Sequence, residues 1–214
     1  MVQGTEMRST LFVGLDVGTT TSKAVVFTEA GEAVATGRAD TPWTFTASGA
    51  ELDANALLTA VKAAVADALA ACPPGPIAAL GVTSLAESGV LLDHRGDPVG
   101  PVIAWHDTRD HAELAHLRHT ITPHDFSAMT GLPLRQQWSL TKHRWLLDNV
   151  PAARSAVRRL NVAEWIVRGL GGESADSAVK KPPNSRWPHA PDGCDWRSAH
   201  GGATPLSGRA PVRR

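Results

Sequence analysis

The chain has 214 residues, which favours one domain or slightly more, with a sizeable hydrophobic core. Its 21 basic and 21 acidic side chains balance, so the composition gives no support for binding nucleic acid or an anionic membrane. The two cysteines, Cys72 and Cys194, show no metal-binding or redox spacing. With no signal-peptide segment and no apolar run of about 18 residues, we expect a soluble cytoplasmic protein.

The first elements are predicted from apolar runs separated by turn residues. Strands are expected over Thr10–Leu15, Ser22–Thr28 and Ala33–Ala39, joined by short turns. The turn between the first two strands is polar. Its glycine, Gly18, has no Cβ and lets the backbone approach a ligand closely.

This turn has the chemistry of a phosphate site. Hydroxyl and backbone N–H groups of Thr19, Thr20, Thr21 and Ser22 are donors for phosphate oxygens, and Lys23 adds positive charge. Asp16, just before the turn, suits Mg²⁺, which takes few carboxylates and keeps several waters. The alternative is an ordinary hairpin whose polar turn residues are only solvated.

The rest of the chain predicts an α/β protein. Asp53 can cap a helix over Ala54–Ala71, with Leu58, Val61, Val65 and Leu69 on one face. The helix ends at the proline-rich residues 73–76. Further strands are expected at Ala79–Ser84 and Gly89–Asp93, and further helices from a Thr108 cap to about His119, at Ser139–Asp148 and at Val162–Gly169. Hairpin-connected strands, a helix and then more strands indicate a mixed sheet.

The stretch Asp16-x-Gly-Thr-Thr-x-x-Lys23 resembles the first phosphate motif of the FGGY carbohydrate kinases, which belong to the actin-like superfamily. Further matches follow in the order that this family shows. They are Ile77–Ser84 with Glu87, Val90–Asp93 with Gly96 and Pro98, Ile103, the Trp105-His-Asp-Thr-Arg109 segment, Thr130–Pro133, Ser139–Trp145, Asn161–Trp165 and Gly169–Glu173. The resemblance covers about Thr10 to Val179. It implies a ribonuclease H-like mixed sheet flanked by helices, and transfer of a phosphoryl group from ATP, with Mg²⁺, to a small sugar or polyol.

The resemblance also implies a substrate side to the site. Glu87 falls where many members contact substrate, and a carboxylate there can accept hydrogen bonds from two sugar hydroxyls. Trp105 can pack against the apolar face of a sugar, with His106 and Asp107 continuing the same edge. The alternatives are a solvated surface carboxylate for Glu87 and a core aromatic for Trp105. Arg109 is expected to pair with a carboxylate inside the domain.

Three further features bear on the substrate, on Lys142 and on a metal site. Glycerol kinases carry Gln-Arg-Glu where this chain has Leu85-Ala86-Glu87, so only the Glu is retained and the motif does not point to glycerol. Lys142 resembles a residue that the family retains, with no role readable from the sequence. His116 and His119 share a helical face, but no further ligand completes a metal site.

The final segment differs in composition from the rest of the chain. Residues 180–214 hold six prolines, four glycines and seven basic residues against two acidic ones, so we expect this tail to be disordered and residues 1–179 to form an incomplete N-terminal kinase domain. A frameshift or premature end is the preferred explanation, and a genuine basic tail is the alternative.

In the family, the catalytic base and the adenosine site lie further along. We therefore expect this chain alone to be inactive. A non-catalytic actin-like module that binds a ligand or partner is the second hypothesis.

Overall fold

The computed structural model describes residues 10–171, which divide into two compact units. One unit holds residues 10–121 and 135–171, and the other holds residues 122–134. The expected domain boundary near Val179 and the expected disorder of residues 180–214 lie outside the described residues, so both stay predictions.

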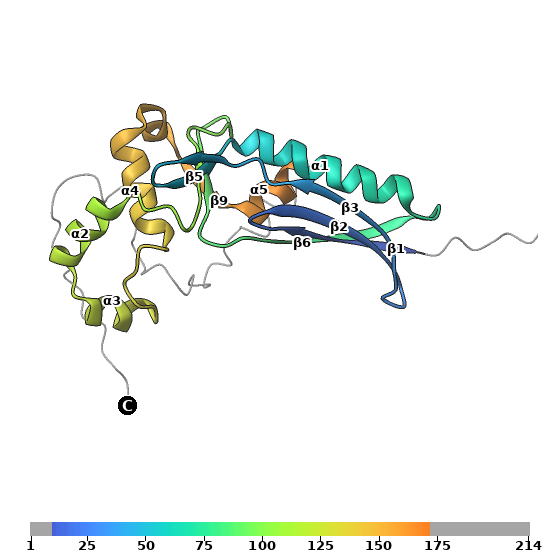
Figure 1. Cartoon of the computed structure of the whole chain (residues 1–214), viewed down its shortest axis with the longest axis horizontal. Coiled ribbons are helices and arrows are strands. Elements are labelled where there is room, and N and C mark those ends of the chain that lie inside the picture. The colour runs from blue at the N-terminus through green and yellow to red at the C-terminus, as the bar shows by residue number, and fades with distance from the viewer. Residues whose placement is uncertain (1–9, 172–214) are drawn as a thin grey trace, which may run out of the picture. The chain divides into compact units, whose positions relative to one another are not determined.

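The larger unit contains a four-stranded sheet with the strand order β3-β2-β1-β6 (Figure 1). Its strands are β1 (Leu11–Val17), β2 (Thr21–Thr28), β3 (Ala33–Asp40) and β6 (Ile77–Ser84). β1 and β3 each pair antiparallel with β2, whereas β1 and β6 run parallel. The parallel pair is possible because a helix connects β3 to β6 and returns the chain across the sheet. The predicted α/β fold with a mixed sheet is confirmed.

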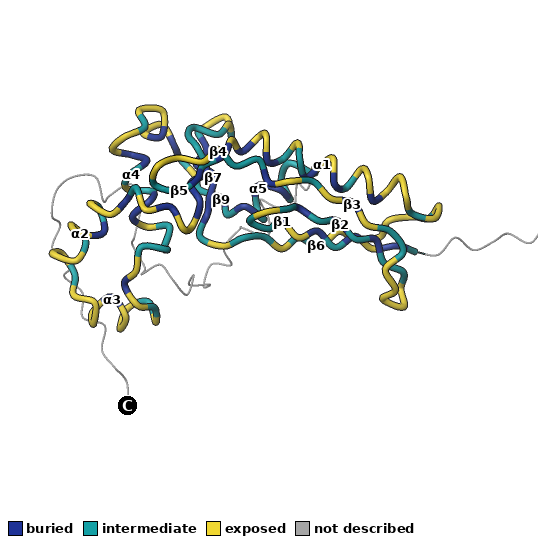
Figure 2. The backbone as a smooth tube through the Cα atoms, viewed as in Figure 1, coloured by how far each residue is buried: buried dark blue, intermediate teal, exposed yellow. Residues whose placement is uncertain are grey.

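Alternating side chains give β1 two different faces. Leu11, Val13, Leu15 and Val17 are buried on the side covered by helix α1, whereas Phe12 and Asp16 are exposed on the other side. The pleat has a period of two residues, so a buried Leu15 and Val17 place Asp16 on the open face. Figure 2 shows this alternation along the strands beneath α1.

Helix α1 (Ala54–Ala71) packs on β2 and β3 and has the predicted bounds. The carboxylate of Asp53 accepts hydrogen bonds from the N–H groups of Asn55 and Ala56, at 2.9 and 2.8 Å, which confirms the predicted cap. The helix approaches β3 closely at Gly37, where an added Cβ would lie 2.0 Å from the carbonyl oxygen of Ala64.

The predicted buried face of α1 is partly wrong. Of the four residues expected there, only Val61 is fully buried, and Leu69 is 40% exposed. Near Gly37 the buried residues are the small Ala64 and Ala68, because the close approach there leaves no room for larger side chains. The buried positions are Ala54, Leu57, Val61, Ala64 and Ala68.

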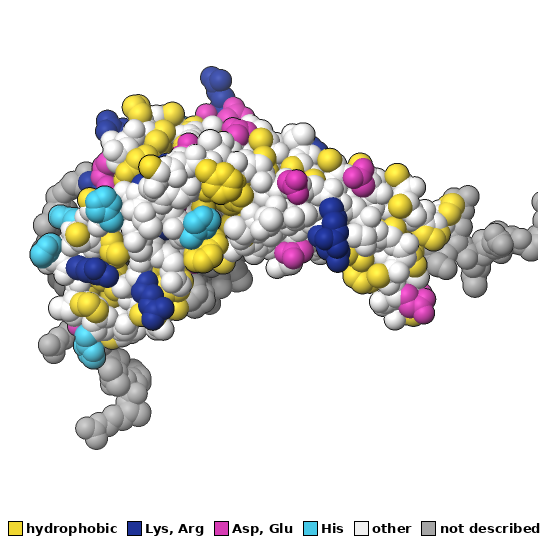
Figure 3. All heavy atoms as spheres, viewed as in Figure 1, with side chains coloured by type: hydrophobic (Ala, Val, Ile, Leu, Met, Phe, Trp, Pro, Cys, Tyr) yellow, Lys and Arg dark blue, Asp and Glu magenta, His cyan; other side chains and the backbone are white. Residues whose placement is uncertain are grey.

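By length and composition alone, α1 is apolar enough to cross a membrane, which also corrects the expectation that no such run exists. In the structure one face of α1 packs on the sheet. On the face of the molecule drawn in Figure 3, the described part over α1, β2 and β3 carries basic and acidic side chains singly, with no patch of one sign.

The remaining elements of this unit extend the core beyond the sheet. They are β4 (Thr44–Thr46), β5 (Gly49–Leu52) and β8 (Val102–Ile103), which form a three-stranded sheet, β7 (Gly89–Leu92), which pairs with β9 (Arg158–Asn161), and the helices α2 (His111–Thr120), α4 (Ser139–Asn149), the 3-10 helix η1 (Pro151–Ser155) and α5 (Val162–Gly169). α5 begins with a capping box between Asn161 and Glu164 and packs beside β6.

Two helix starts differ from the prediction. α2 begins at His111 after Asp110, so Thr108 does not cap it; the Thr108 hydroxyl instead donates to the carbonyl of Ser48 at 3.0 Å. The second difference is a helix that was not predicted, α3 (Pro123–Thr130), in the smaller unit. Thr122 caps α3, and Gly131 ends it in the left-handed conformation, with φ of 73°.

Candidate functional site

Except for Ser22, whose side chain is fully buried, the predicted phosphate residues lie at one end of the four-stranded sheet. Asp16 on β1 is exposed and lies between Lys23 of β2 and Thr83 of β6 in the strand register. The turn that follows needs a glycine at position 18, because an added Cβ would lie 2.9 Å from the carbonyl oxygen of Thr21. Thr19 and Thr20 form the tip of the turn, and Thr21 already begins β2.

Glu87 lies just after β6, where the chain leaves the same end of the sheet. It has a positive φ of 57°, which is uncommon for a residue other than glycine. One oxygen of its carboxylate, Oε2, accepts hydrogen bonds from the backbone N–H and the hydroxyl of Ser139, both at 2.7 Å. Ser139 is the first residue of α4, so the Glu87 carboxylate lies at the positive end of that helix.

An open pocket of about 310 Å³ connects these two regions. Its size is at the lower end of the usual range for small-molecule sites, roughly 300–1,000 Å³. Thr19 of the predicted phosphate turn lines it together with Glu87 and Trp105. The other lining residues are Leu85, Ala86, Gln137 and Trp138. Residues far apart in the sequence therefore form one concave surface.

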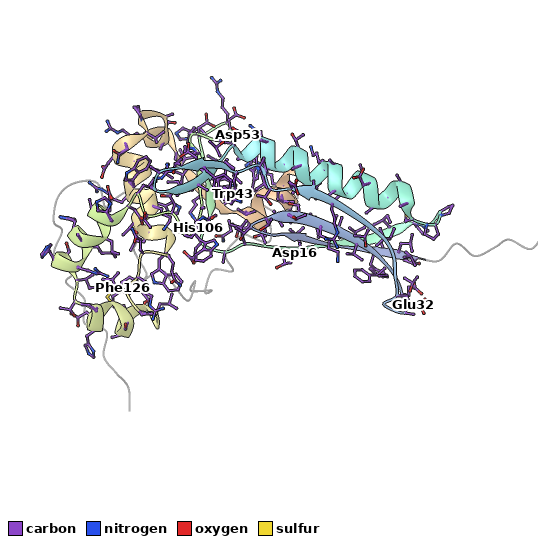
Figure 4. All side chains as sticks on the ribbon, in the orientation of Figure 1. Asp16, Glu32, Trp43, Asp53, His106 and Phe126 are labelled. Atoms are coloured by element: carbon purple, nitrogen blue, oxygen red, sulfur yellow. The ribbon has the colours of Figure 1, made fainter. Side chains whose placement is uncertain are left out.

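Of Trp105 and His106, only Trp105 is among the residues that line this pocket. Trp105 lines the pocket and is 42% exposed, so its ring is not a core aromatic. His106 packs edge to face against it, with ring centroids 5.4 Å apart and planes at 81°. Figure 4 shows Asp16, Trp43 and His106 toward the same end of the sheet.

Asp107 is placed differently from its two neighbours. It is fully buried, and its oxygens Oδ1 and Oδ2 accept hydrogen bonds from Nε and Nη2 of Arg109 at 3.0 and 2.9 Å. Burial raises the pKa of Asp107, but the hydrogen bonds and charge of Arg109 outweigh burial and hold the pKa below its usual value. Arg109 also pairs with Glu51. These contacts give Asp107 a structural role in this arrangement, and its contact with substrate stays a prediction.

A second polar cluster lies behind Glu87. The Arg159 guanidinium donates to the hydroxyl of Ser139 at 2.9 Å, to Nε2 of His143 at 2.8 Å and to the side-chain oxygen of Asn161 at 2.6 Å. Gly89 leaves room for this guanidinium, since an added Cβ would lie 2.6 Å from Arg159 Nε. Arg159 therefore links the residue that holds Glu87 to strand β9.

The structure gives Lys142 two contacts near the pocket. Its Nζ donates to the carbonyl of Gln136 at 2.6 Å and lies 3.5 Å from the buried carboxylate of Asp110. Burial lowers the pKa of Lys142, and the Asp110 charge offsets this only in part. Lys142 thus fixes the backbone just before Gln137 and Trp138, which line the pocket.

The sequence analysis missed several residues of this site. Gln137 and Trp138 immediately precede the predicted helix at Ser139, so their position at a helix entrance was a signal that could have drawn attention to them. Ser139 and Arg159 contact Glu87 or its partner only through the tertiary fold. Ser139 lies in a family match and begins a predicted helix, but no local pattern in the sequence indicates its contact with Glu87 or the place of Arg159.

Comparison with known proteins agrees with this architecture. Residues 11–176 match the model of the FGGY family of carbohydrate kinases, N-terminal domain. A glycerol kinase from Beutenbergia cavernae is 34% identical over 169 residues, which cover 75% of this chain and 34% of that protein. Glycerol kinase 2 from Streptomyces avermitilis is 35% identical over 167 residues, covering 74% of this chain and 33% of that protein.

Solved structures give the same result. The xylulose kinase from Rhodospirillum rubrum superposes with a TM-score of 0.69 at 27% identity, over 73% of this chain and 33% of that chain. The gluconate kinase from Lactobacillus acidophilus has the same fold, with a TM-score of 0.68 at 24% identity over 74% of this chain and 32% of that chain. The chain spans about a third of the length of these relatives. It belongs to the FGGY family of carbohydrate kinases, and the part that matches is their N-terminal domain.

Proposed function

We propose that this domain binds a sugar or polyol in the pocket and holds the phosphate end of MgATP at the turn between β1 and β2. The observation that carries the proposal is the lining of one 310 Å³ pocket by Thr19, Glu87 and Trp105. A phosphate-binding turn and a hydroxyl-binding carboxylate must be neighbours if a phosphoryl group is to pass to a hydroxyl.

The sugar side of the pocket combines one charge with apolar surface. Oε2 of Glu87 is engaged by Ser139, whereas Oε1 accepts no hydrogen bond from residues 10–171 and is available to substrate hydroxyls. Trp105 offers an exposed ring for the apolar face of a sugar. Gln137 adds an amide that can both donate and accept.

The phosphate side fits a nucleotide with Mg²⁺. The backbone N–H groups of Thr19 and Thr20 donate to no acceptor within residues 10–171, and the side chains of Asp16 and Lys23 flank the turn. In the described part of the chain no group of three His, Cys, Asp or Glu side chains could hold a metal, so Asp16 would be one of at most two such ligands. That donor set fits Mg²⁺, which binds through one or two carboxylates plus phosphate and water. When bound, Mg²⁺ would neutralise charge on the phosphates.

The substrate class follows from the relatives, whose names are glycerol, xylulose and gluconate kinase. We propose a small polyhydroxylated substrate and a cytoplasmic location, as for metabolic kinases that use ATP. We also propose that this chain alone turns over no sugar, because the resemblance places the catalytic base and the adenosine site in parts of the relatives beyond the matched third.

Calorimetry on the chain tests the two halves of the site separately. Glycerol, D-xylulose and D-gluconate are titrated without nucleotide, and MgATP is titrated without sugar. Glu87→Ala should weaken binding of the preferred sugar by about 1.5–3 kcal/mol, the value of a hydrogen bond to a charged group, and leave MgATP affinity unchanged. Asp16→Ala should weaken binding of MgATP and leave the affinity for the sugar unchanged.

The matched control is Glu32→Ala, which removes an exposed carboxylate from the turn between β2 and β3 and should change neither affinity (Figure 4). If Asp16→Ala weakens the sugar as much as Glu87→Ala does, the proposed division of the site is wrong. A coupled assay of ADP release tests the inactivity of the chain, and turnover near 1 s⁻¹, a low value for enzymes, would contradict it.

A further inference from the structure

We infer that Thr41 and Trp43, in the segment after β3, are positioning residues that hold the turn at Gly18–Thr20 in its phosphate-binding conformation. The inference rests on the proposed function, because it assigns a task to residues outside the turn. Neither residue belongs to the motif by which the turn was recognised.

Three consecutive carbonyl groups of the turn are bound by this segment. The hydroxyl of Thr41 donates to the carbonyl of Gly18 at 2.8 Å, and the indole Nε1 of Trp43 donates to the carbonyl of Thr19 at 2.5 Å. The backbone N–H of Thr41 donates to the carbonyl of Thr20 at 2.9 Å. One short segment thus fixes every carbonyl of the turn.

Binding the carbonyls determines where the N–H groups point. In a trans peptide the C=O of one residue and the N–H of the next point in opposite directions. The N–H groups of Thr19 and Thr20 follow the carbonyls of Gly18 and Thr19, so they point away from Thr41 and Trp43. Both groups are unpaired within residues 10–171. Adjacent N–H groups on one side of a turn form a concave site for anions.

The segment is itself held rigidly. Thr41 is buried, and it continues directly from β3, whose last pair joins Asp40 to Thr21. Pro42 fixes its own φ and restricts Thr41 to extended conformations. The Trp43 ring packs against the hydrophobic core. The turn is therefore tied to the core through two side chains that do not face the pocket.

Two nearly isosteric variants test this inference. Trp43→Phe keeps an aromatic ring and removes the donor to Thr19, and Thr41→Val keeps the shape and removes the donor to Gly18. NMR titration with MgATP, following the amide signals of Thr19 and Thr20, should show affinity reduced between about two- and tenfold in each variant, the effect of one hydrogen bond. Affinity for the preferred sugar should stay within about twofold of that of the unmodified chain. The control is Phe45→Leu, which changes an exposed side chain two residues further along and should leave both affinities unchanged.

The outcomes separate this inference from the proposed function. If the unmodified chain does not bind MgATP, the proposed phosphate site is wrong, and the positioning role is then judged without ligand from amide exchange of Gly18 and Thr41, whose N–H groups donate to the carbonyls of Thr21 and Thr20. Faster exchange at these amides in Trp43→Phe, with the rest of β1 and β2 unchanged, supports it. MgATP affinity equal to that of the unmodified chain in both variants, or unchanged exchange at these two amides, would overturn it.

Discussion

The carboxylate of Glu87 and the backbone of Ser139 are joined across 52 positions of sequence by a hydrogen bond of 2.7 Å, and the Ser139 hydroxyl donates to the same oxygen at the same distance. Glu87 is thus both a wall of the pocket and a partner for the first N–H of α4. Substrate binding and the position of α4 share one side chain. Changes at Glu87 should therefore have two measurable effects.

The first prediction concerns the stability part of this double role. Glu87→Ala should lower the free energy of unfolding by about 1–3 kcal/mol, because it leaves the Ser139 N–H at the helix start without its acceptor. Glu87→Gln should lower it less, since the amide oxygen can still accept. Urea denaturation followed by tryptophan fluorescence measures both values. Equal stability of the Ala variant and the unmodified chain would show that the contact has no structural role.

The second prediction concerns the buried pair of Asp107 and Arg109. Arg109→Met should destabilise the fold by about 3–5 kcal/mol, because it leaves the fully buried Asp107 carboxylate without its main partner. The double variant with Asp107→Asn should recover part of this loss.

The control for that pair is the exposed ion pair of Arg144 and Asp148 on α4, whose side chains are 44% and 43% exposed. Arg144→Met should lower stability by less than about 1 kcal/mol, as for surface pairs in general. Thermal and urea denaturation measure the stability of Arg109→Met, of the double variant and of Arg144→Met against that of the unmodified chain. A similar loss in Arg109→Met and Arg144→Met would mean that Asp107 is not held as the structure indicates.

The third prediction uses two glycines of the same sheet. Gly37→Ala should destabilise the domain by about 1–3 kcal/mol or more, because its Cβ would meet the backbone of α1 at Ala64. Gly81 on β6 has no atom within 4 Å of an added Cβ, so Gly81→Ala should change stability by less than about 0.5 kcal/mol. Urea denaturation of both variants compares them. A tolerated Gly37→Ala would show that α1 does not approach β3 this closely.

Local signals predicted the regular elements well. The apolar alternation and glycine turns gave β1, β2 and β3 to within two residues at each end, and the Asp53 cap with the proline-rich stop gave α1. The face of α1 was misjudged because periodicity favours large apolar residues such as Leu69, whereas the sheet selects small ones where Gly37 meets the helix. Such a choice depends on the distance between two elements, which no sequence window contains.

In the site too, local signals predicted some residues, whereas others act only through the tertiary fold. The phosphate turn and Glu87 were predicted because each follows an apolar strand and matches a family motif. The task of Ser139 in holding Glu87, and that of Thr41 and Trp43 in holding the turn, could not be predicted, because each acts by a hydrogen bond across more than 20 positions of sequence. Asp107 lies in a motif beside Trp105, yet neighbouring residues of an irregular segment can point to different environments. Here one is exposed and the other buried.

The final prediction is a pH dependence of stability that arises from His143. Its Nε2 accepts a hydrogen bond from Arg159 and therefore carries no proton. Burial, with the nearby positive charges of Arg159 and Lys142, holds the pKa of His143 well below its usual value of 6.5. Between that lowered pKa and about 6.5 the unfolded chain binds a proton that the folded chain does not. The free energy of unfolding should therefore fall as the pH falls through this window, by up to about 1.4 kcal/mol per pH unit, and this contribution should be constant above pH 7.

Urea denaturation between pH 7 and pH 5 measures this slope. His143→Gln retains an oxygen that can accept from Arg159 and removes the titrating group, so its stability should depend less on pH than that of the unmodified chain. His116→Gln, on the exposed surface of α2, is the matched control and should keep the slope of the unmodified chain. If His143→Gln keeps that slope as well, the acid sensitivity arises elsewhere, and the hydrogen bond from Arg159 does not hold His143 neutral in the folded state.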